Sequence, residues 1–459
     1  MTNTILVNKN NPIKESFYQK INLIKIKDID DEETLIEENT YLAYQNLQEA
    51  LKKENIEIGI ESVFREIAYQ EELKNRLFIE KGEDYVKKYV TEPGCSEHHT
   101  GLAIDIAIKK DGICQDNPSI EDYQKIHSVL HKFGFILRYP EGKEDITGYS
   151  YEPWHIRYVG KIPAKIIAEN NLTLEEYINN FGCILYINKP QGITSFDVVH
   201  EIKKLFGLKK VGHTGTLDPI ATGVMLVAVG KATKIVELLT AEDKEYITKV
   251  ELGIKTDTYD ITGKVLETKE VSENINIEKT LSTFKKTYLQ EVPIYSAVKV
   301  NGQKLYDYAR KEKEVTLPKK EVTIKEIELL EENKNKFTFR ALVSKGCYIR
   351  SLIMDISKEL NTYGTMSSLI RTKQGKITLE ETNTLEDIKN NHFQVHKLEE
   401  VLNFQTVIPS KEEERLLIHG VKIEDRWNIS DKVIFKTNKN QLIGIYEKEG
   451  KYLKTWKNF

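Results

Sequence analysis

Two groups of residues in this chain have types and spacings that could support chemistry, and the two groups are unrelated. The first is the segment SEHHTGLAID at 96–105, followed by EPWH at 152–155, and the second is GHTGTLDP at 212–219. The first group offers the ligands of a metal-dependent hydrolase, whereas the second presents one aspartate, Asp218, in a tight loop between glycines. Because no single active site would need both groups, the sequence indicates two enzymes fused end to end.

The first group has the composition of a catalytic zinc site. His98 and Asp105 are seven residues apart, and His155 must come from another element. Two imidazoles and one carboxylate bind Zn²⁺ and leave a fourth position open for water. Glu152 could take a proton from that water, and Arg65 could stabilise negative charge on the substrate oxygen. A His–Asp pair at this spacing is also common without a metal, so the spacing alone leaves both interpretations open.

Residues 1–179 resemble the VanY-type D-alanyl-D-alanine carboxypeptidases. The resemblance is carried by SVFR at 62–65, PGCSEH at 93–98 and EPWHIRYVG at 152–160. It implies a zinc peptidase that cuts D-Ala-D-Ala-terminated peptides. By this resemblance the zinc ligands would be His98, Asp105 and His155. Glu152 would be the general base, and Arg65 would stabilise the transition state. The sequence departs from the family at three positions, with Val63 for Gly, Phe64 for Tyr and His99 for Gln. These departures affect the expected shape of the substrate pocket more than the zinc site.

The second group holds its aspartate rigidly. Gly212 and Gly215 allow a tight turn, and Pro219 keeps Asp218 out of helical geometry. A carboxylate presented in this way can act as a nucleophile or a general base. The same residues would equally form an ordinary Asx turn, so the loop by itself does not decide between the two interpretations.

Residues 183 to about 390 resemble the TruB-type tRNA pseudouridine synthases. The matching segments are NKPQG at 188–192, GHTGTLDP, TDTYD at 256–260, KGCYIR at 345–350 and LIRT at 369–372. The resemblance implies conversion of the T-loop uridine of tRNA (position 55 in tRNA numbering) to pseudouridine without a cofactor. The ending, around 400–459, looks like the small PUA-like domain of bacterial members.

The residue roles in the second region also follow from this resemblance. Asp218 would attack the target nucleotide, and Arg350 would pair with the Asp218 carboxylate. Tyr246 would pack on the flipped uracil. His213 would accommodate the extruded base, and two further residues would line the pocket, namely Tyr348 and Leu369. Four departures from the family leave its core catalytic groups in place: Cys347 for Thr, Val292 for Pro, Met366 for His and Ile370 for Arg. Those at 366 and 370 concern RNA contacts.

Composition fits a protein of several domains. The 459 residues are too many for one ordinary core and predict roughly three domains. Four isolated cysteines without a C-x-x-C pair, and no basic and apolar leader, favour a reducing cytoplasm. No segment approaches the ~18 apolar residues of a membrane span, and we expect a monomer. Residues 1–182 contain 22 Lys and Arg against 32 Asp and Glu, a net charge of −10. Since the whole chain has a net charge of −4, residues 183–459 have a net charge of +6.

The expected fold class is α+β in three domains. These are a zinc carboxypeptidase domain at 1–181, a mixed-sheet pseudouridine synthase domain at 182–392 and a small β-rich PUA-like domain at 393–459. Helical spacing of apolar residues predicts two helices before residue 160, at 41–53 and 120–133, and later ones at 172–178, 196–206 and 384–389. Strand-like segments are predicted at 56–60, 184–187, 246–252, 337–343 and 433–435.

The sequence therefore predicts a bifunctional bacterial enzyme. One alternative is that the N-terminal domain has lost hydrolysis and only docks to or stabilises the synthase. Another is that two neighbouring reading frames were joined artificially. Metal content together with peptide turnover separates the first alternative from the bifunctional enzyme, and the mass of the native protein tests the second.

Overall fold

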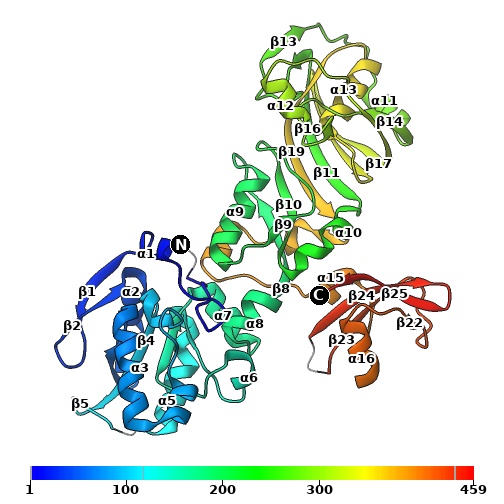
Figure 1. The fold of residues 1–459 in the computed structure, drawn as a ribbon. Helices are drawn as coiled ribbons and strands as arrows, with labels where there is room; N and C mark the ends of the chain where they lie inside the picture. The colour runs from blue at the N-terminus through cyan, green and yellow to red at the C-terminus, as the bar shows by residue number, and fades with distance from the viewer. Residues whose placement is uncertain (1–2, 117, 439–440) are drawn as a thin grey trace. The chain divides into compact units, whose positions relative to one another are not determined.

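The computed structural model describes residues 3–116, 118–438 and 441–459 and shows an α+β protein (Figure 1). The chain divides into two compact units. The first comprises Met1–Phe181 with Glu201–Lys210, and the second comprises Gly182–His200 with Val211–Phe459. In the described part of the chain, no helix combines the length and apolar character needed to cross a bilayer.

The first unit is built on an antiparallel sheet with the strand order β3-β4-β7-β6, to which β5 adds at β4. Its central strand, β4, is buried over most of its length because helices cover the sheet (Figure 1). Helix α2 buries Tyr44, Leu47 and Leu51 at helical spacing, and Glu37 caps its start by accepting from Thr40 N–H at 2.7 Å. The strands are β1 (Leu23–Lys27), β2 (Glu33–Glu37), β3 (Glu57–Ser62), β4 (Ala103–Lys110), β5 (Ile113–Cys114), β6 (Phe135–Leu137) and β7 (His155–Tyr158).

The helices of the first unit surround this sheet. They are α1 (Glu15–Tyr18), α2 (Glu38–Lys53), α3 (Ile67–Lys81), α4 (Glu83–Tyr89), η1 (Glu97–Thr100), α5 (Ile120–Leu130), η2 (His131–Phe133), α6 (Glu144–Thr147), α7 (Lys161–Glu169) and α8 (Leu174–Asn180). A capping box between Thr173 and Glu176 begins α8, close to the start of the helix predicted at 172–178.

The second unit contains a mixed sheet in the order β14-β17-β18-β11-β19-β10-β8, with β9 and β20 added at β10 and β19. Within this sheet only β10 and β19 pair in parallel among the described residues. Its strands are β8 (Gly182–Lys189), β9 (Val211–His213), β10 (Thr222–Gly230), β11 (Lys244–Leu252), β14 (Thr287–Glu291), β17 (Lys319–Asn333), β18 (Lys336–Val343), β19 (Gly364–Gln374) and β20 (Ile377–Thr378). Two hairpins accompany it, β12 (Ile254–Thr256) with β13 (Val265–Thr268) and β15 (Lys299–Val300) with β16 (Gln303–Lys304).

A separate five-stranded sheet closes the chain in the order β21-β23-β24-β25-β22. Its strands are β21 (Gln405–Val407), β22 (Ile423–Glu424), β23 (Lys432–Lys436), β24 (Leu442–Glu449) and β25 (Tyr452–Asn458). The helices after residue 182 are α9 (Ser195–Phe206), η3 (Lys231–Ile235), α10 (Val236–Thr240), α11 (Ile277–Thr283), α12 (Leu305–Arg310), α13 (Ile349–Glu359), η4 (Leu379–Glu381), α14 (Leu385–Lys389), α15 (Leu398–Leu402) and α16 (Lys411–Ile418).

The expectation of only two helices before residue 160 was wrong. Helices α3 and α4 were missed because their apolar residues do not form a buried stripe: in α3 the buried side chain is Gln70, while Phe78 and Ile79 are exposed. The helix expected at 120–133 ends earlier, since α5 gives way to a 3₁₀ turn before Gly134, whose φ of +87° ends the segment.

Candidate functional site

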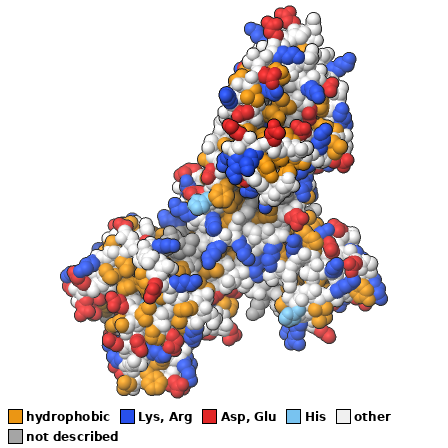
Figure 2. Space-filling model, turned by 45° about the horizontal axis from the view of Figure 1, so that its top comes forward, with side chains coloured by type: hydrophobic (Ala, Val, Ile, Leu, Met, Phe, Trp, Pro, Cys, Tyr) orange, Lys and Arg blue, Asp and Glu red, His pale blue; other side chains and the backbone are white. Residues whose placement is uncertain are grey.

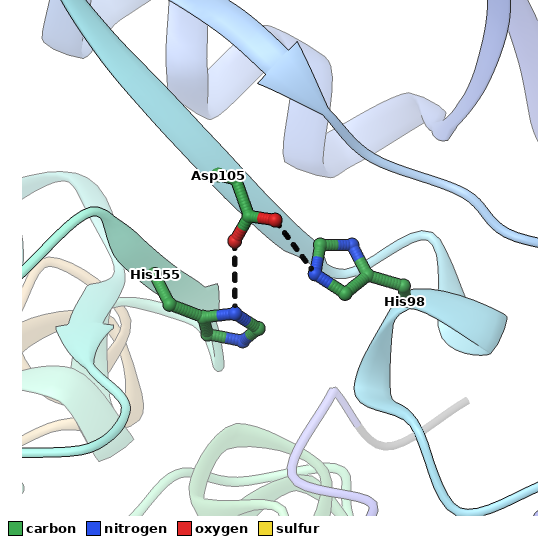
Figure 3. A group of neighbouring side chains, drawn as sticks. All are labelled: His98, Asp105 and His155. Carbon is green, nitrogen blue, oxygen red and sulfur yellow. Dashed lines mark ion pairs between the residues drawn. The ribbon is translucent and has the colours of Figure 1, made fainter. Parts of the chain in front are cut away.

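The sheet of the first unit brings the three expected zinc ligands together (Figure 3). Asp105 on β4 and His155 on β7 are direct partners in the antiparallel register. His98 comes from the 3₁₀ turn η1, which begins where Ser96 Oγ accepts from the His98 N–H and ends at Gly101 with φ +66°. The sharp turn returns the chain to β4, so residues 98 and 105 face the same point.

These three side chains have the geometry of a metal-binding group. Asp105 Oδ1 lies 2.9 Å from His155 Nδ1, and Asp105 Oδ2 lies 3.2 Å from His98 Nε2. One nitrogen or oxygen from each residue falls within 4.8 Å of the others, and all three residues are buried. His98 Nδ1 lies 2.5 Å from the Val63 carbonyl. Since that contact fixes the proton on Nδ1, the lone pair of Nε2 faces the group, as in histidines that bind metals.

Glu152 and Arg65 border the same group. Glu152 Oε2 is 3.8 Å from His155 Nδ1, and burial raises the pKa of this carboxyl to about 7. Arg65 donates to Asp105 Oδ2 at 2.6 Å and to Ser62 Oγ at 3.0 Å. The three residues of the metal-binding group line one cleft of about 940 Å³ together with Glu152, Arg65 and Ser62. A carboxyl that can act as a base and an arginine cation therefore share one space with that group.

A buried ionic network behind this cleft was not predicted. Glu97 Oε1 is 2.8 Å from Arg138 Nε and 2.7 Å from Arg157 Nη1, and its Oε2 lies 3.9 Å from His155 Nε2. Arg138 also pairs with Glu175. Glu97, Arg138 and Arg157 are at most 1% exposed. The only sequence signal was a glutamate beside His98, and nothing in the spacing pointed to its two distant arginines.

In the second unit Asp218 occupies the loop between β9 and β10, as the sequence predicted. Arg350 on α13 contacts both of its oxygens: Nη2 donates to Oδ1 at 3.1 Å, and Nε forms an ion pair with Oδ2 at 2.8 Å. The guanidinium also donates to the carbonyls of Thr258 and Tyr295. Burial raises the pKa of Asp218, whereas the Arg350 cation acts in the opposite direction. Arg350 therefore holds the carboxylate in one orientation.

A second buried arginine fixes the path of this loop. Arg371 donates to the carbonyls of Gly215, Thr216 and Val224 at 3.1–3.2 Å and to the Tyr246 hydroxyl at 3.2 Å. Its side chain is 1% exposed. This residue belongs to the LIRT segment on β19, but nothing in the sequence indicated that it binds the aspartate loop.

The remaining predicted residues gather around the same loop or its supports. Tyr246 on β11 is opposite Arg371 on β19, and Leu369 on β19 is buried opposite Thr248. Gly215 N–H donates to His213 Nδ1 at 3.2 Å. Tyr348 precedes α13, and burial raises the pKa of its hydroxyl.

Comparison with known proteins assigns both regions. The family description "D-alanyl-D-alanine carboxypeptidase" matches residues 33–161, and "TruB family pseudouridylate synthase (N terminal domain)" matches residues 203–349. The tRNA pseudouridine synthase B of Clostridium tetani is 40% identical over 271 residues, covering 58% of this chain and 92% of that protein. The Fusobacterium nucleatum protein of the same name is 51% identical over 203 residues, covering 43% and 69%.

The chain is also similar to solved structures, each over part of its length. A VanY D,D-pentapeptidase from a VanB-type resistance cassette, in complex with Zn(II), is 34% identical and covers 38% of this chain and 98% of its own, with a TM-score of 0.33. The family match over residues 203–349 and the Clostridium tetani relative place the site around Asp218 in a protein of the pseudouridine synthase class. The chain belongs to the TruB family of tRNA pseudouridine synthases, and it carries a domain of the D-alanyl-D-alanine carboxypeptidase family at residues 33–161.

We predict that Glu97→Gln destabilises the first unit strongly. Removing the carboxylate leaves two buried guanidinium groups without their shared anion, and breaking a buried pair in this way costs about 3–5 kcal/mol. Calorimetry of the full chain should show a lower midpoint for the first unit, with little change after the matched substitution Glu49→Gln at an exposed position. Equal midpoints for the two variants would contradict the role given to Glu97.

Proposed function

We propose that this chain has two activities: it converts the T-loop uridine of tRNA (position 55) to pseudouridine, and it hydrolyses D-Ala-D-Ala-terminated peptides with a bound zinc ion. The observation that carries the first activity is the bidentate contact between Arg350 and Asp218 in a TruB-family chain. The observation that carries the second is the buried group of His98, Asp105 and His155. We place both activities in a monomeric, cytoplasmic enzyme.

For the synthase, the residues of the second unit supply a nucleophile and its setting. Asp218 is held by Arg350 and would attack the nucleotide, the N1–C1′ glycosidic bond would break, and the uracil would rotate so that C5 bonds to C1′. The bond to Asp218 would then be released, C5 would lose its proton and N1 would gain one, so that no atom is added or lost. Tyr246, Tyr348 and Leu369 would hold the flipped base, and His213 would accommodate its extrusion. In Figure 2, Lys and Arg side chains predominate over Asp and Glu near the middle of the view, over the part that Figure 1 labels β8 to β10. Such a face suits the phosphates of tRNA.

For the peptidase, the donor set fits Zn²⁺, since two imidazoles and a carboxylate leave an open position. His98, Asp105 and His155 would hold the ion, which would lower the pKa of a bound water. Glu152, next to His155, would take the proton from this water and pass it to the leaving amine. Arg65 would stabilise the developing oxyanion. The domain boundaries that we propose remain 1–181, 182–392 and 393–459.

Asp218→Asn should abolish pseudouridine formation and leave the fold intact, because an amide keeps the size of the carboxylate but is not a nucleophile. The measurement is pseudouridine content of a T-loop transcript after incubation, with the thermal midpoint as the folding control. Product formed at the wild-type rate would remove Asp218 from the mechanism.

The synthase should lose activity in acid because the nucleophile must be ionised. Burial raises the pKa of Asp218 above its ordinary value of 3.8, so the rate should fall as the pH drops through that raised pKa. Arg350 lowers this pKa, and the residual activity of Arg350→Met should therefore decline at a higher pH than that of the wild type. Single-turnover rates across pH test this, and an acid limb that does not move in the variant would contradict the pairing.

His155→Ala should lose zinc but retain tRNA modification, because two ligands are too few for a stable catalytic site. Elemental analysis of the full chain measures the metal. Glu152→Gln is the matched variant: it should keep zinc, since Glu152 is not a ligand, and lose roughly 10²–10⁴-fold in peptide turnover. Undiminished zinc in His155→Ala would refute the ligand set. A zinc-loaded wild type that hydrolyses no such peptide would favour the docking alternative.

A further inference from the structure

Helix α13 carries Arg350, yet the side chain of its N-cap residue does not cap the start of the helix. Tyr348 stands at the N-cap position, and its side chain accepts no hydrogen bond from the first turn. Its carbonyl accepts the Leu352 N–H at 3.0 Å, so the helix starts here. A helix without a side-chain cap needs another group to hold its first turn.

Gln290, on the edge strand β14, supplies that group. Its Oε1 accepts the backbone N–H of Tyr348 at 2.8 Å, and its Nε2 donates to the Tyr288 hydroxyl at 2.9 Å. The Nε2 is also 3.8 Å from Cys347 Sγ. Gln290 is 1% exposed, so its amide is committed to these partners inside the protein. Burial raises the pKa of Cys347 to about 12, which keeps this neighbour an uncharged thiol.

The same strand holds the helix at a second point. The Tyr288 hydroxyl donates to Asp355 Oδ2 at 2.9 Å. Tyr348 and Asp355 lie on either side of Arg350 along the chain, so β14 holds α13 before and after the arginine. The side chains of Tyr288 and Gln290 are two residues apart and lie on one side of the strand, whereas Leu289 between them is exposed on the other side.

We propose that Gln290 is a positioning residue for pseudouridine formation, which sets the start of α13 so that Arg350 meets both oxygens of Asp218. This inference rests on the proposed synthase function. The side-chain amide of Gln290 contacts Tyr288, Cys347 and Tyr348, and it therefore acts on Arg350 through the backbone at the start of the helix. Its loss should therefore affect the chemical step more than RNA binding, because a displacement of about 1 Å at reacting groups can cost 10²-fold in rate.

The test is Gln290→Met in the full chain, which keeps the length of the side chain and removes the hydrogen bonds of its amide. With a T-loop RNA substrate, kcat should fall by about tenfold or more while KM changes by less than about twofold. Leu289→Ala, on the opposite face of β14, is the matched control and should leave kcat unchanged. A kcat of Gln290→Met within about twofold of the wild type, or a change confined to KM, would overturn the proposal.

A double-mutant cycle and a crystal structure separate positioning from a loss of stability. Tyr288→Phe should give a smaller defect, because it leaves the contact between Gln290 and the Tyr348 N–H in place. The defect of Tyr288→Phe with Gln290→Met should be smaller than the product of the two single defects, since the two residues share a hydrogen bond of 2.9 Å. In the crystal structure of Gln290→Met, the 2.8 Å contact from Arg350 Nε to Asp218 should be lost, and its retention would overturn the proposal. Absence of pseudouridine with the wild type would instead refute the proposed function, and the crystal structure alone would then decide the role of Gln290.

Discussion

An arginine can be buried only where acceptors surround its guanidinium, because an unpaired buried charge costs several kcal/mol. Both sites of this chain depend on that constraint. In the first unit, Arg138 and Arg157 converge on Glu97, whose other oxygen faces His155. In the second unit, Arg371 joins β19 to the loop that carries Asp218. Elements far apart in the sequence are thereby held at fixed positions, and the reactive side chains lie where those elements meet.

The sequence predicted the reactive residues better than their supports. His98, Asp105 and His155 were predicted as one group because their types match zinc chemistry, and the structure brings them together. Glu97 and Arg371 were not predicted as supports. Glu97 lies more than 40 residues from Arg138, and Arg371 lies more than 150 residues from Gly215, and pairings at such separations leave no periodic pattern in the sequence. Helix α3 was missed for a related reason: its exposed apolar side chains give no amphipathic pattern. Local spacing identifies chemistry, whereas long-range contacts are set by the tertiary fold.

The two proposed activities draw on different physical resources. In our proposal the peptidase groups would place carboxylate and imidazole around a cation in a cleft, and a domain kept only for docking would give no chemical role to a buried His–Asp–His group with Glu152 beside it. The synthase groups would work without a metal, through one carboxylate that Arg350 contacts and that we propose is oriented with the help of the strand that holds α13. No residue belongs to both sets.

The central claim is that one chain performs two independent reactions, of which only one needs a metal. The most direct measurement is to assay a single preparation of the full chain for both reactions, before and after removal of metal with a chelator and again after zinc is restored. Our account predicts that peptide turnover disappears and returns with zinc while pseudouridine formation is unchanged throughout. Loss of pseudouridine formation on chelation, or peptide turnover that persists without metal, would contradict it.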